Sequence, residues 1–289
     1  MDNLRGGAIM VLAMLGFAIE DMFIKMLSGA VPVGQILMML GIGGSLIFAI
    51  VVRLQGRALF ERAMWSGPVV LRAAGEIVGT VGFVNAIVFT TLSSASAILQ
   101  ATPLVVTLGA AVFLSEPVGW RRWSAILIGF LGVLMIIRPG LEGFTPLSLL
   151  AVVGVLGLAV RDLATRKTTN VLSTMQLSFL GFLAIVPAGA ALIAFGPDEL
   201  TPMTLRSIVL MGMALAIGVV AYYGIVAAMR VGDISFVTPF RYTRLIFALI
   251  LGASIFGDRP DMWTLIGAAI IVSSGIYTVW RERRIKAVP

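Results

Sequence analysis

The sequence predicts an all-α integral membrane protein in which ten transmembrane helices form two inverted five-helix repeats. The 289 residues are 59% hydrophobic and only 12% charged, with a mean hydropathy of +1.05. Soluble domains carry about twice that share of charged residues. The apolar residues fall into ten runs close to the ~20 residues that a helix needs to cross a bilayer. The two halves of the chain resemble each other, and because five is an odd number, such halves must insert in opposite directions.

The ten runs follow one another with short breaks, and none of the connections is long enough for a separate soluble domain. In chain order, the runs lie near residues 6–27, 33–53, 69–89, 93–114, 122–138, 147–166, 174–195, 205–229, 234–256 and 262–281. Proline, glycine and serine mark the breaks, as expected for residues that end helices. These breaks contain Pro32, Gly67-Pro68, Ser93-Ser94, Pro117, Pro139-Gly140, Pro197, Gly232-Asp233 and Pro260.

The distribution of basic residues predicts the orientation. Of the 21 Lys and Arg residues, 13 fall on the side of the two termini, four on the opposite side (Lys25, Arg138, Arg206 and Arg259) and four inside helices. Because Lys and Arg accumulate on the cytoplasmic side, both termini are expected in the cytoplasm of a bacterial-type inner membrane. The tail RERRIK at 281–286 then fits an anchor to anionic lipid better than a nucleic-acid site. No cleavage motif follows the N-terminal residues, so the first run is expected to be a retained helix.

An internal repeat supports the inversion. The stretch GFAIEDMFIK at 16–25 resembles GLAVRDLATRK at 157–167, and Asp21 meets Asp162 at an offset of 141 residues. Gln35 and Gln176 share that offset, and Glu116 and Asp258 are 142 residues apart. The predicted repeats are residues 1–140 and 141–289, which form one transport unit with a cavity between them. Inverted repeats are typical of secondary transporters.

Two longer segments resemble a known family. They are ATPLVVTLGAAVFLSEPVGWRRWSAILIGFLGVLMIIRPG at 101–140 and FRYTRLIFALILGASIFGDRPDMWTLIGAAIIVSSGIYTVW at 240–280. Their proline, acid-proline turn and glycine-rich following helix resemble the EamA type of the drug/metabolite transporter (DMT) superfamily, and within it the YddG-like amino-acid exporters. The second copy departs from the pattern, because Leu245 stands where the first has Pro103. The resemblance implies ten helices and transport of amino acids or other metabolites.

Ionisable residues inside the spans are the first candidates for substrate binding, since each costs ~2.5–3.5 kcal/mol at the centre of a bilayer. Arg244 falls near the middle of its run, and Glu76 lies roughly 12 Å from the end of its own. A zwitterionic amino acid would place its carboxylate near Arg244 and its ammonium near Glu76. An internal ion pair of Glu76 with Arg244 or Arg241 is the alternative. Neutral candidates, which more often bridge helices than bind a ligand, are Asn85, Gln100, Thr102, Tyr222 and Tyr242.

Two charge clusters lie near opposite faces of the membrane. The first contains Glu20, Asp21 and Lys25, and the second contains Arg161, Asp162 and Arg166. In both, an acid precedes a base by four residues, the favourable order for a pair on one helix face. Each cluster is therefore either an anchoring pair at a helix end or a gate that closes its own side of the transport pathway.

The absence of Cys and His from the chain excludes thiolate chemistry, histidine-ligated metals and imidazole catalysis. No catalytic residues, metal or cofactor are expected, and the expected partners are a small-molecule substrate and the lipid bilayer. The predicted function is a secondary transporter that exports amino acids and related small metabolites by alternating access. A drug or other metabolite transporter, including one for sugar nucleotides, is the alternative within the same fold. A non-transporting membrane protein and an intramembrane enzyme are the alternatives from other classes.

Overall fold

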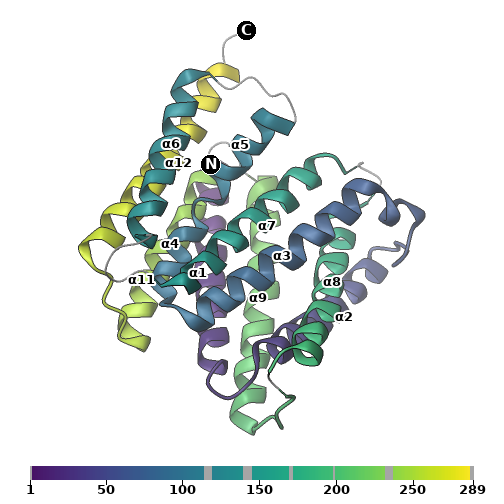
Figure 1. The fold of residues 1–289 in the computed structure, drawn as a ribbon. Coiled ribbons are helices and arrows are strands. Elements are labelled where there is room, and N and C mark those ends of the chain that lie inside the picture. The colour runs from purple at the N-terminus through teal and green to yellow at the C-terminus, as the bar shows by residue number, and fades with distance from the viewer. Residues whose placement is uncertain are drawn as a thin grey trace.

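The computed structural model describes residues 2–113, 119–138, 145–168, 172–197, 199–231 and 237–286, and the ordered elements in this part of the chain are all helices (Figure 1). The first half contains α1 (Asp2–Leu27), α2 (Val33–Leu54), η1 (Arg62–Trp65), α3 (Gly67–Phe89), α4 (Leu92–Leu99), α5 (Thr102–Phe113) and α6 (Trp120–Ile137). The second half contains η2 (Pro146–Ser148), α7 (Leu149–Arg166), α8 (Thr174–Phe195), α9 (Leu205–Val231), η3 (Thr238–Tyr242), α11 (Thr243–Phe256) and α12 (Met262–Lys286).

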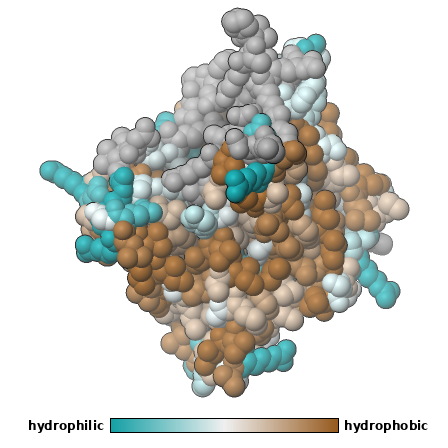
Figure 2. Space-filling model, turned by 180° about the vertical axis from the view of Figure 1, so that it is seen from behind, coloured by the Kyte–Doolittle hydropathy of each residue, from teal (hydrophilic) through white to brown (hydrophobic). Residues whose placement is uncertain are grey.

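The described helices match the predicted spans and confirm the fold class. Eight spans are long and apolar enough to cross a bilayer, and the two remaining runs form the shorter apolar helices Trp123–Ile137 and Met262–Thr278. Side chains of these helices make a broad apolar surface across the middle of the molecule, with hydrophilic residues gathered towards its edges (Figure 2). Such a surface is stable in a lipid bilayer and would be costly in water.

Two predicted spans are interrupted. The fourth run was expected to form one helix, but α4 ends at Leu99 and α5 begins at Thr102, with Gln100 and Ala101 in a turn between them. Residues 234–236 of the ninth run lie outside the described residues, and the run continues through the 3-10 turn η3 before α11 begins. Pro103 lies in the first turn of α5, and Pro239 lies in the first turn of η3. Proline fits a first turn because its missing N–H has no partner there.

The two halves run in opposite directions. We call the face where α1 begins and α12 ends the terminal face, and the opposite one the far face (Figure 1). The helix α1 runs from the terminal face to the far face, whereas α7, the first long helix of the second half, starts at the far face. The predicted boundary between residues 140 and 141 falls in 139–144, outside the described residues.

Equivalent helices of the two halves pack in equivalent pairs. The helix α3 lies along α7, and α1 lies along α9. A Cβ atom on Gly157 of α7 would collide with the backbone of Gly79 in α3, and one on Gly16 of α1 would lie 2.9 Å from the Cβ atom of Ala221 in α9. Gly16 and Gly157 are 141 positions apart in the chain, and their partners Gly79 and Ala221 are 142 positions apart. Small residues therefore permit the same close helix approach twice, once in each orientation.

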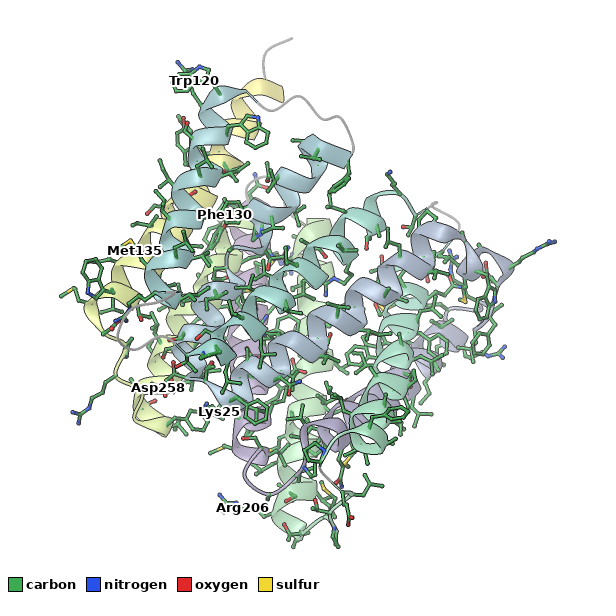
Figure 3. All side chains as sticks on the ribbon, viewed as in Figure 1. Lys25, Trp120, Phe130, Met135, Arg206 and Asp258 are labelled. Carbon is green, nitrogen blue, oxygen red and sulfur yellow. The ribbon has the colours of Figure 1, made fainter. Side chains whose placement is uncertain are left out.

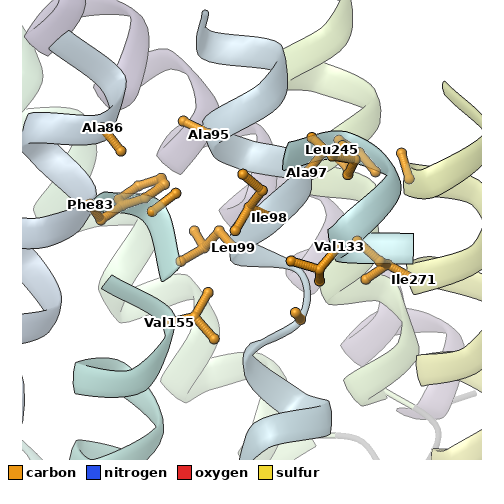
Figure 4. Packing of buried hydrophobic residues seen from close by; sticks show 14 of the residues in the cluster. Phe83, Ala86, Ala95, Ala97, Ile98, Leu99, Val133, Val155, Leu245 and Ile271 are labelled. Atoms are coloured by element: carbon orange, nitrogen blue, oxygen red, sulfur yellow. The ribbon is translucent and has the colours of Figure 1, made fainter. Parts of the chain in front are cut away.

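The broken span α4–α5 passes through the largest apolar cluster. Ile98 and Leu99 of α4 are buried against Phe83 of α3, Val155 of α7 and Ile271 of α12 (Figure 4). Residues of α6 and α11 complete the cluster. Because both halves contribute to it, the interruption at Gln100 is held at the centre of the molecule.

Candidate functional site

Arg244 forms a buried ion pair with Asp21. The guanidinium is on the first turn of α11, and its Nη2 and Nε atoms donate to Oδ2 of Asp21 at 2.6 and 3.1 Å. The side chain of Asp21 is only 4% exposed and that of Arg244 is 18% exposed. Rings of Phe17 and Phe83 lie 5.1 and 5.3 Å from the guanidinium carbon, a distance at which the ring faces attract a cation. The pair joins the first helix of one half to the ninth predicted span.

Glu20 adds a second carboxylate beside this pair. It precedes Asp21 on α1 and is half-buried against α9, where glycine at position 218 leaves room for its carboxylate group. No hydrogen bond or ion pair of Glu20 is formed with the residues that the structure describes. The surroundings of Arg244 thus hold two acidic groups, Asp21, which pairs with it, and Glu20, which does not.

A second ionic cluster connects α3 with α7. Nη1 of Arg161 lies 3.1 Å from Oε1 of Glu76, and its Nη2 lies 2.8 Å from Oδ1 of Asp162. Arg72 approaches the other oxygen of Glu76 at 3.6 Å and donates to the carbonyl of Leu177 in α8 at 2.9 Å. Two acids and two bases therefore balance within this cluster, which lies between helices that pack through glycine.

Glu76 forms internal ion pairs, but neither Arg244 nor Arg241 is a partner in them. Glu76 is bound by Arg161 and Arg72, whereas Arg244 pairs with Asp21. The predicted pairing of Glu76 with Arg244 or Arg241 is therefore wrong. Arg241 is half-buried and lies within electrostatic range of Asp162 and Arg161 on one side and Arg244 on the other.

One of the predicted pairs within the charge clusters is wrong. Asp21 does not pair with Lys25, because the arginine on α11 reaches its carboxylate. Asp162 contacts its neighbour Arg161, while the side chain of Arg166, its predicted partner, lies outside the described residues. The sequence points to Arg244, because it is a charge in an apolar run, but not to Phe17 or Phe83. Contact between an aromatic ring and a distant cation leaves no periodic pattern in a sequence.

The neutral candidates are spread over several contacts. Gln100 donates to the backbone carbonyl of Tyr242 at 3.4 Å, and the Tyr242 hydroxyl is buried and has no hydrogen-bond partner among the described residues. Asn85 donates to the carbonyl of Val81 in its own helix, and Thr102 donates across the break between α4 and α5 to the carbonyl of Leu99. Tyr222 packs edge-on against Phe48, with 5.3 Å between ring centroids, and lies within electrostatic range of Arg161. Only Gln100 and Tyr242 are brought directly together.

Lys25 belongs to a set of contacts between helix ends near the far face. Its ammonium donates to the carbonyls of Ile87 and Thr90 at the end of α3, where the helix dipole favours a cation. Asp258, after α11, accepts from the backbone N–H and the hydroxyl of Ser93 at the start of α4, both at 3.2 Å. Figure 3 shows Lys25 and Asp258 at one end of the molecule, with Trp120 at the opposite end. We call this set of contacts the far-face latch.

Two grooves have none of the ion-paired side chains of these clusters in their lining. An apolar groove of about 460 Å³ runs between η3, α11 and α12, and is lined by residues such as Pro239, Leu249 and Val272. The other, of about 420 Å³, lies between α6 and α12 and includes Trp120 and Tyr277. Groups of three or more potential metal-ligating side chains do not occur among the described residues.

Both halves of the chain match one family of known proteins. Residues 4–138 and, separately, residues 146–280 match the EamA-like transporter family. The chain belongs to the EamA-like transporter family. It is a multi-pass membrane transporter of the DMT superfamily, and the family consists of transporters rather than enzymes.

Relatives of this EamA-like chain carry different substrates. A pseudopaline exporter from Pseudomonas aeruginosa is 29% identical over 285 residues, which cover 94% of this chain and 95% of that protein. An S-adenosylmethionine uptake transporter from Rickettsia bellii is 29% identical over 193 residues, or 67% of this chain and 65% of that protein. A riboflavin transporter from Rhizobium johnstonii is 32% identical over 68% of this chain and 64% of that protein. A solved crystal structure shares the fold with a TM-score of 0.66 and 19% identity, covering 98% of this chain and 99% of that one.

Proposed function

We propose that this EamA-like protein is a secondary transporter that exports amino acids and related zwitterionic metabolites across the cytoplasmic membrane. The observation that supports this proposal is the position of Arg244, a guanidinium held by one carboxylate inside an apolar helix bundle. Arginine binds carboxylates through two parallel hydrogen bonds, so the same group suits the carboxylate of an amino acid. An isolated guanidinium in this environment would be costly, and a substrate that replaces Asp21 must supply an equivalent negative charge.

Alternating access follows from the repeat in this proposal. The two halves, residues 1–140 and 141–289, would exchange conformations, so that the site opens to one face and then to the other. In this proposal the structure corresponds to a state closed at the far face, where Lys25 and Asp258 join the ends of α1, α3, α4 and α11. With the terminal face assigned to the cytoplasm by its excess of basic residues, this state would accept substrate from inside the cell.

The relatives support an organic substrate without fixing its class. The S-adenosylmethionine transporter acts on a molecule that carries an α-amino acid group, which fits a site containing both acidic and basic side chains. The riboflavin transporter favours a second candidate function, transport of a larger heterocyclic metabolite, for which stacking on aromatic rings would matter more than charge. A sugar nucleotide would need several cations at its diphosphate. In the structure, however, the guanidinium of Arg244 is bound by Asp21, and those of Arg72 and Arg161 are bound by Glu76.

Counterflow into proteoliposomes tests the proposal. Vesicles containing the purified protein and a high internal concentration of one unlabelled compound are given the same labelled compound outside, for amino acids, riboflavin, nucleotide sugars and S-adenosylmethionine in turn. We expect accumulation for amino acids, and its loss in Arg244→Gln but not in Arg259→Gln, which changes an exposed arginine on the far face. A response to riboflavin or a nucleotide sugar alone would overturn the amino-acid assignment. A response to none of the compounds, from folded protein, would count against transport of these classes altogether.

A further inference from the structure

The groups around Arg244 are those that recognise an organic cation. A carboxylate contacts the guanidinium from α1, and two aromatic rings, Phe17 and Phe83, lie near it at 5.1 and 5.3 Å. Aromatic faces combined with a carboxylate are the usual recognition elements for quaternary ammonium and related cations. Arg244 therefore occupies a position whose chemistry would also suit the positive group of a substrate.

The ion pairs point in the same direction. Arg244 contacts Asp21, while Glu20 beside it makes no hydrogen bond or ion pair with the described residues. In the cluster at Glu76, Arg72 and Arg161 contact Glu76, and Arg161 also contacts Asp162. Glu20, one residue from the carboxylate that holds Arg244, is thus the acid in these two clusters that has no basic partner among the described residues. An incoming cation is favoured at this position and not at Glu76, where a substrate ammonium was first expected.

We infer that Glu20, Asp21, Phe17 and Phe83 form an organic-cation site that Arg244 occupies while the transporter is empty. This inference rests on the proposed function, because it assigns the positive group of the proposed zwitterion to a specific place. When the ammonium of a substrate enters, Arg244 leaves Asp21 and meets the carboxylate of the same substrate. One ion pair is exchanged for two, and no charge is left alone in the apolar interior.

The exchange also sets specificity. A molecule with only a carboxylate can bind Arg244 but leaves Asp21 buried without a partner. A molecule with only a cation that displaces Arg244 from Asp21 leaves the guanidinium without the carboxylate that it contacts. Only a zwitterion satisfies both sides, so discrimination arises from the penalty for unpaired buried charge as well as from attraction. A simple cation should therefore bind weakly to the wild type and compete with the zwitterionic substrate.

Tetramethylammonium is a suitable probe, because it carries the cation without a carboxylate. Its affinity for the purified full-length protein is measured by titration calorimetry in detergent. We expect weak binding to the wild type and at least about tenfold tighter binding to Arg244→Gln, in which the internal cation has been removed. Arg138→Gln breaks the ion pair with Asp261 near the far face, and should leave the affinity for tetramethylammonium unchanged. Equal affinity in the wild type and in folded Arg244→Gln would overturn the inference.

Two variants that keep the Asp21–Arg244 pair provide a test that does not depend on the stability of Arg244→Gln. Phe83→Leu keeps an apolar side chain but removes one ring, and Glu20→Gln keeps the shape but removes one charge. Each should weaken tetramethylammonium binding about tenfold relative to the wild type. If neither changes it, the site is not formed by these residues. Because the probe is not an amino acid, its binding can succeed while amino-acid counterflow fails, which would refute the proposed substrate class and leave the cation site standing.

Discussion

Gln100 donates its side-chain amide to the backbone carbonyl of Tyr242 at 3.4 Å, and the two residues are 142 positions apart in the chain. That spacing is the spacing of the internal repeat, so equivalent positions of the two halves touch each other. Equivalent residues can meet only close to the axis that relates the halves. The axis therefore passes where both interrupted spans are broken, and helix breaks of this kind expose backbone groups at the membrane centre of transporters.

The hydroxyl of Tyr242 gives the first prediction. It is buried without a hydrogen-bond partner among the described residues, and such a group costs about 1–3 kcal/mol. Tyr242→Phe should therefore raise the free energy of unfolding of the purified protein by roughly 1 kcal/mol. If the hydroxyl forms a hydrogen bond with the substrate, the same change should weaken substrate binding. Tyr223→Phe, at a side chain that is 65% exposed, is the matched control and should change neither quantity. Lower stability in Tyr242→Phe would show that the hydroxyl has a partner in the native protein.

The close crossing of α3 and α7 gives a second prediction. A methyl group on Gly157 would overlap the backbone of Gly79, whereas one on Gly212 of α9 meets nothing within 4 Å. Gly157→Ala should destabilise the protein by several kcal/mol, because backbone atoms cannot move aside without separating the two helices. Gly212→Ala should be neutral or stabilising by about 0.5–1 kcal/mol through the lower entropy of the unfolded chain. Thermal melting of both variants in the same detergent makes the comparison, and equal effects would contradict this account of the crossing.

The fold could be predicted from the sequence because its signals are local or periodic. Runs of apolar residues identify the spans by length alone, and an odd number of spans in each half forces the inversion. The break after Leu99 was not anticipated, since ATPLVV continues the apolar pattern and proline is compatible with a first helical turn. Helix breaks inside an apolar run depend on packing from other parts of the chain, which composition does not record.

The site could be predicted only in part, for a related reason. Arg244, Asp21 and Glu76 were identified because each is a charge in an apolar run, which is visible in one sequence. Their pairing was not, because the partners are far apart in the chain: Asp21 and Arg244 are separated by 223 residues. The i,i+4 rule chose Lys25 for Asp21, but the lysine instead reaches the end of α3. Local spacing competes with tertiary contacts, and in the interior of a bundle the tertiary contacts decide.

The start of α12 gives a prediction about pH. Asp261 accepts from the backbone N–H of Thr264 at 2.8 Å and from Arg138. Partial desolvation raises the pKa of the Asp261 carboxyl, but the hydrogen bonds from Thr264 and Arg138 outweigh it and leave the pKa below its ordinary value of 3.8. A pKa that is lower in the folded state means that the carboxylate stabilises the fold above pH 3.8, and that this contribution is lost as the pH falls through the folded value.

Asp261→Asn tests this dependence, because asparagine can still cap the helix but does not titrate. The wild type should be more stable than the variant near pH 6, and the difference should shrink below about pH 4. Thermal melting of both proteins at a series of pH values measures the difference, so that titration of other groups cancels. A difference that stays constant down to about pH 2.5 would show that the carboxylate of Asp261 contributes nothing to stability.

The far-face latch gives the last prediction. Lys25→Met removes the ammonium that binds the carbonyls of Ile87 and Thr90, and each charge-assisted hydrogen bond contributes about 1.5–3 kcal/mol. If the latch holds this face closed, the variant should populate the state that is open to the far face at least about tenfold more.

The chain has no cysteine, so Ser96→Cys provides a single thiol at a position that is 1% exposed behind the latch. Its reaction with a membrane-impermeant maleimide added to spheroplasts should be about tenfold faster when Lys25→Met is also present. Lys167→Met, at the terminal face, should leave the rate unchanged, and an unchanged rate in Lys25→Met would reduce Lys25 to an anchor of the α3 terminus.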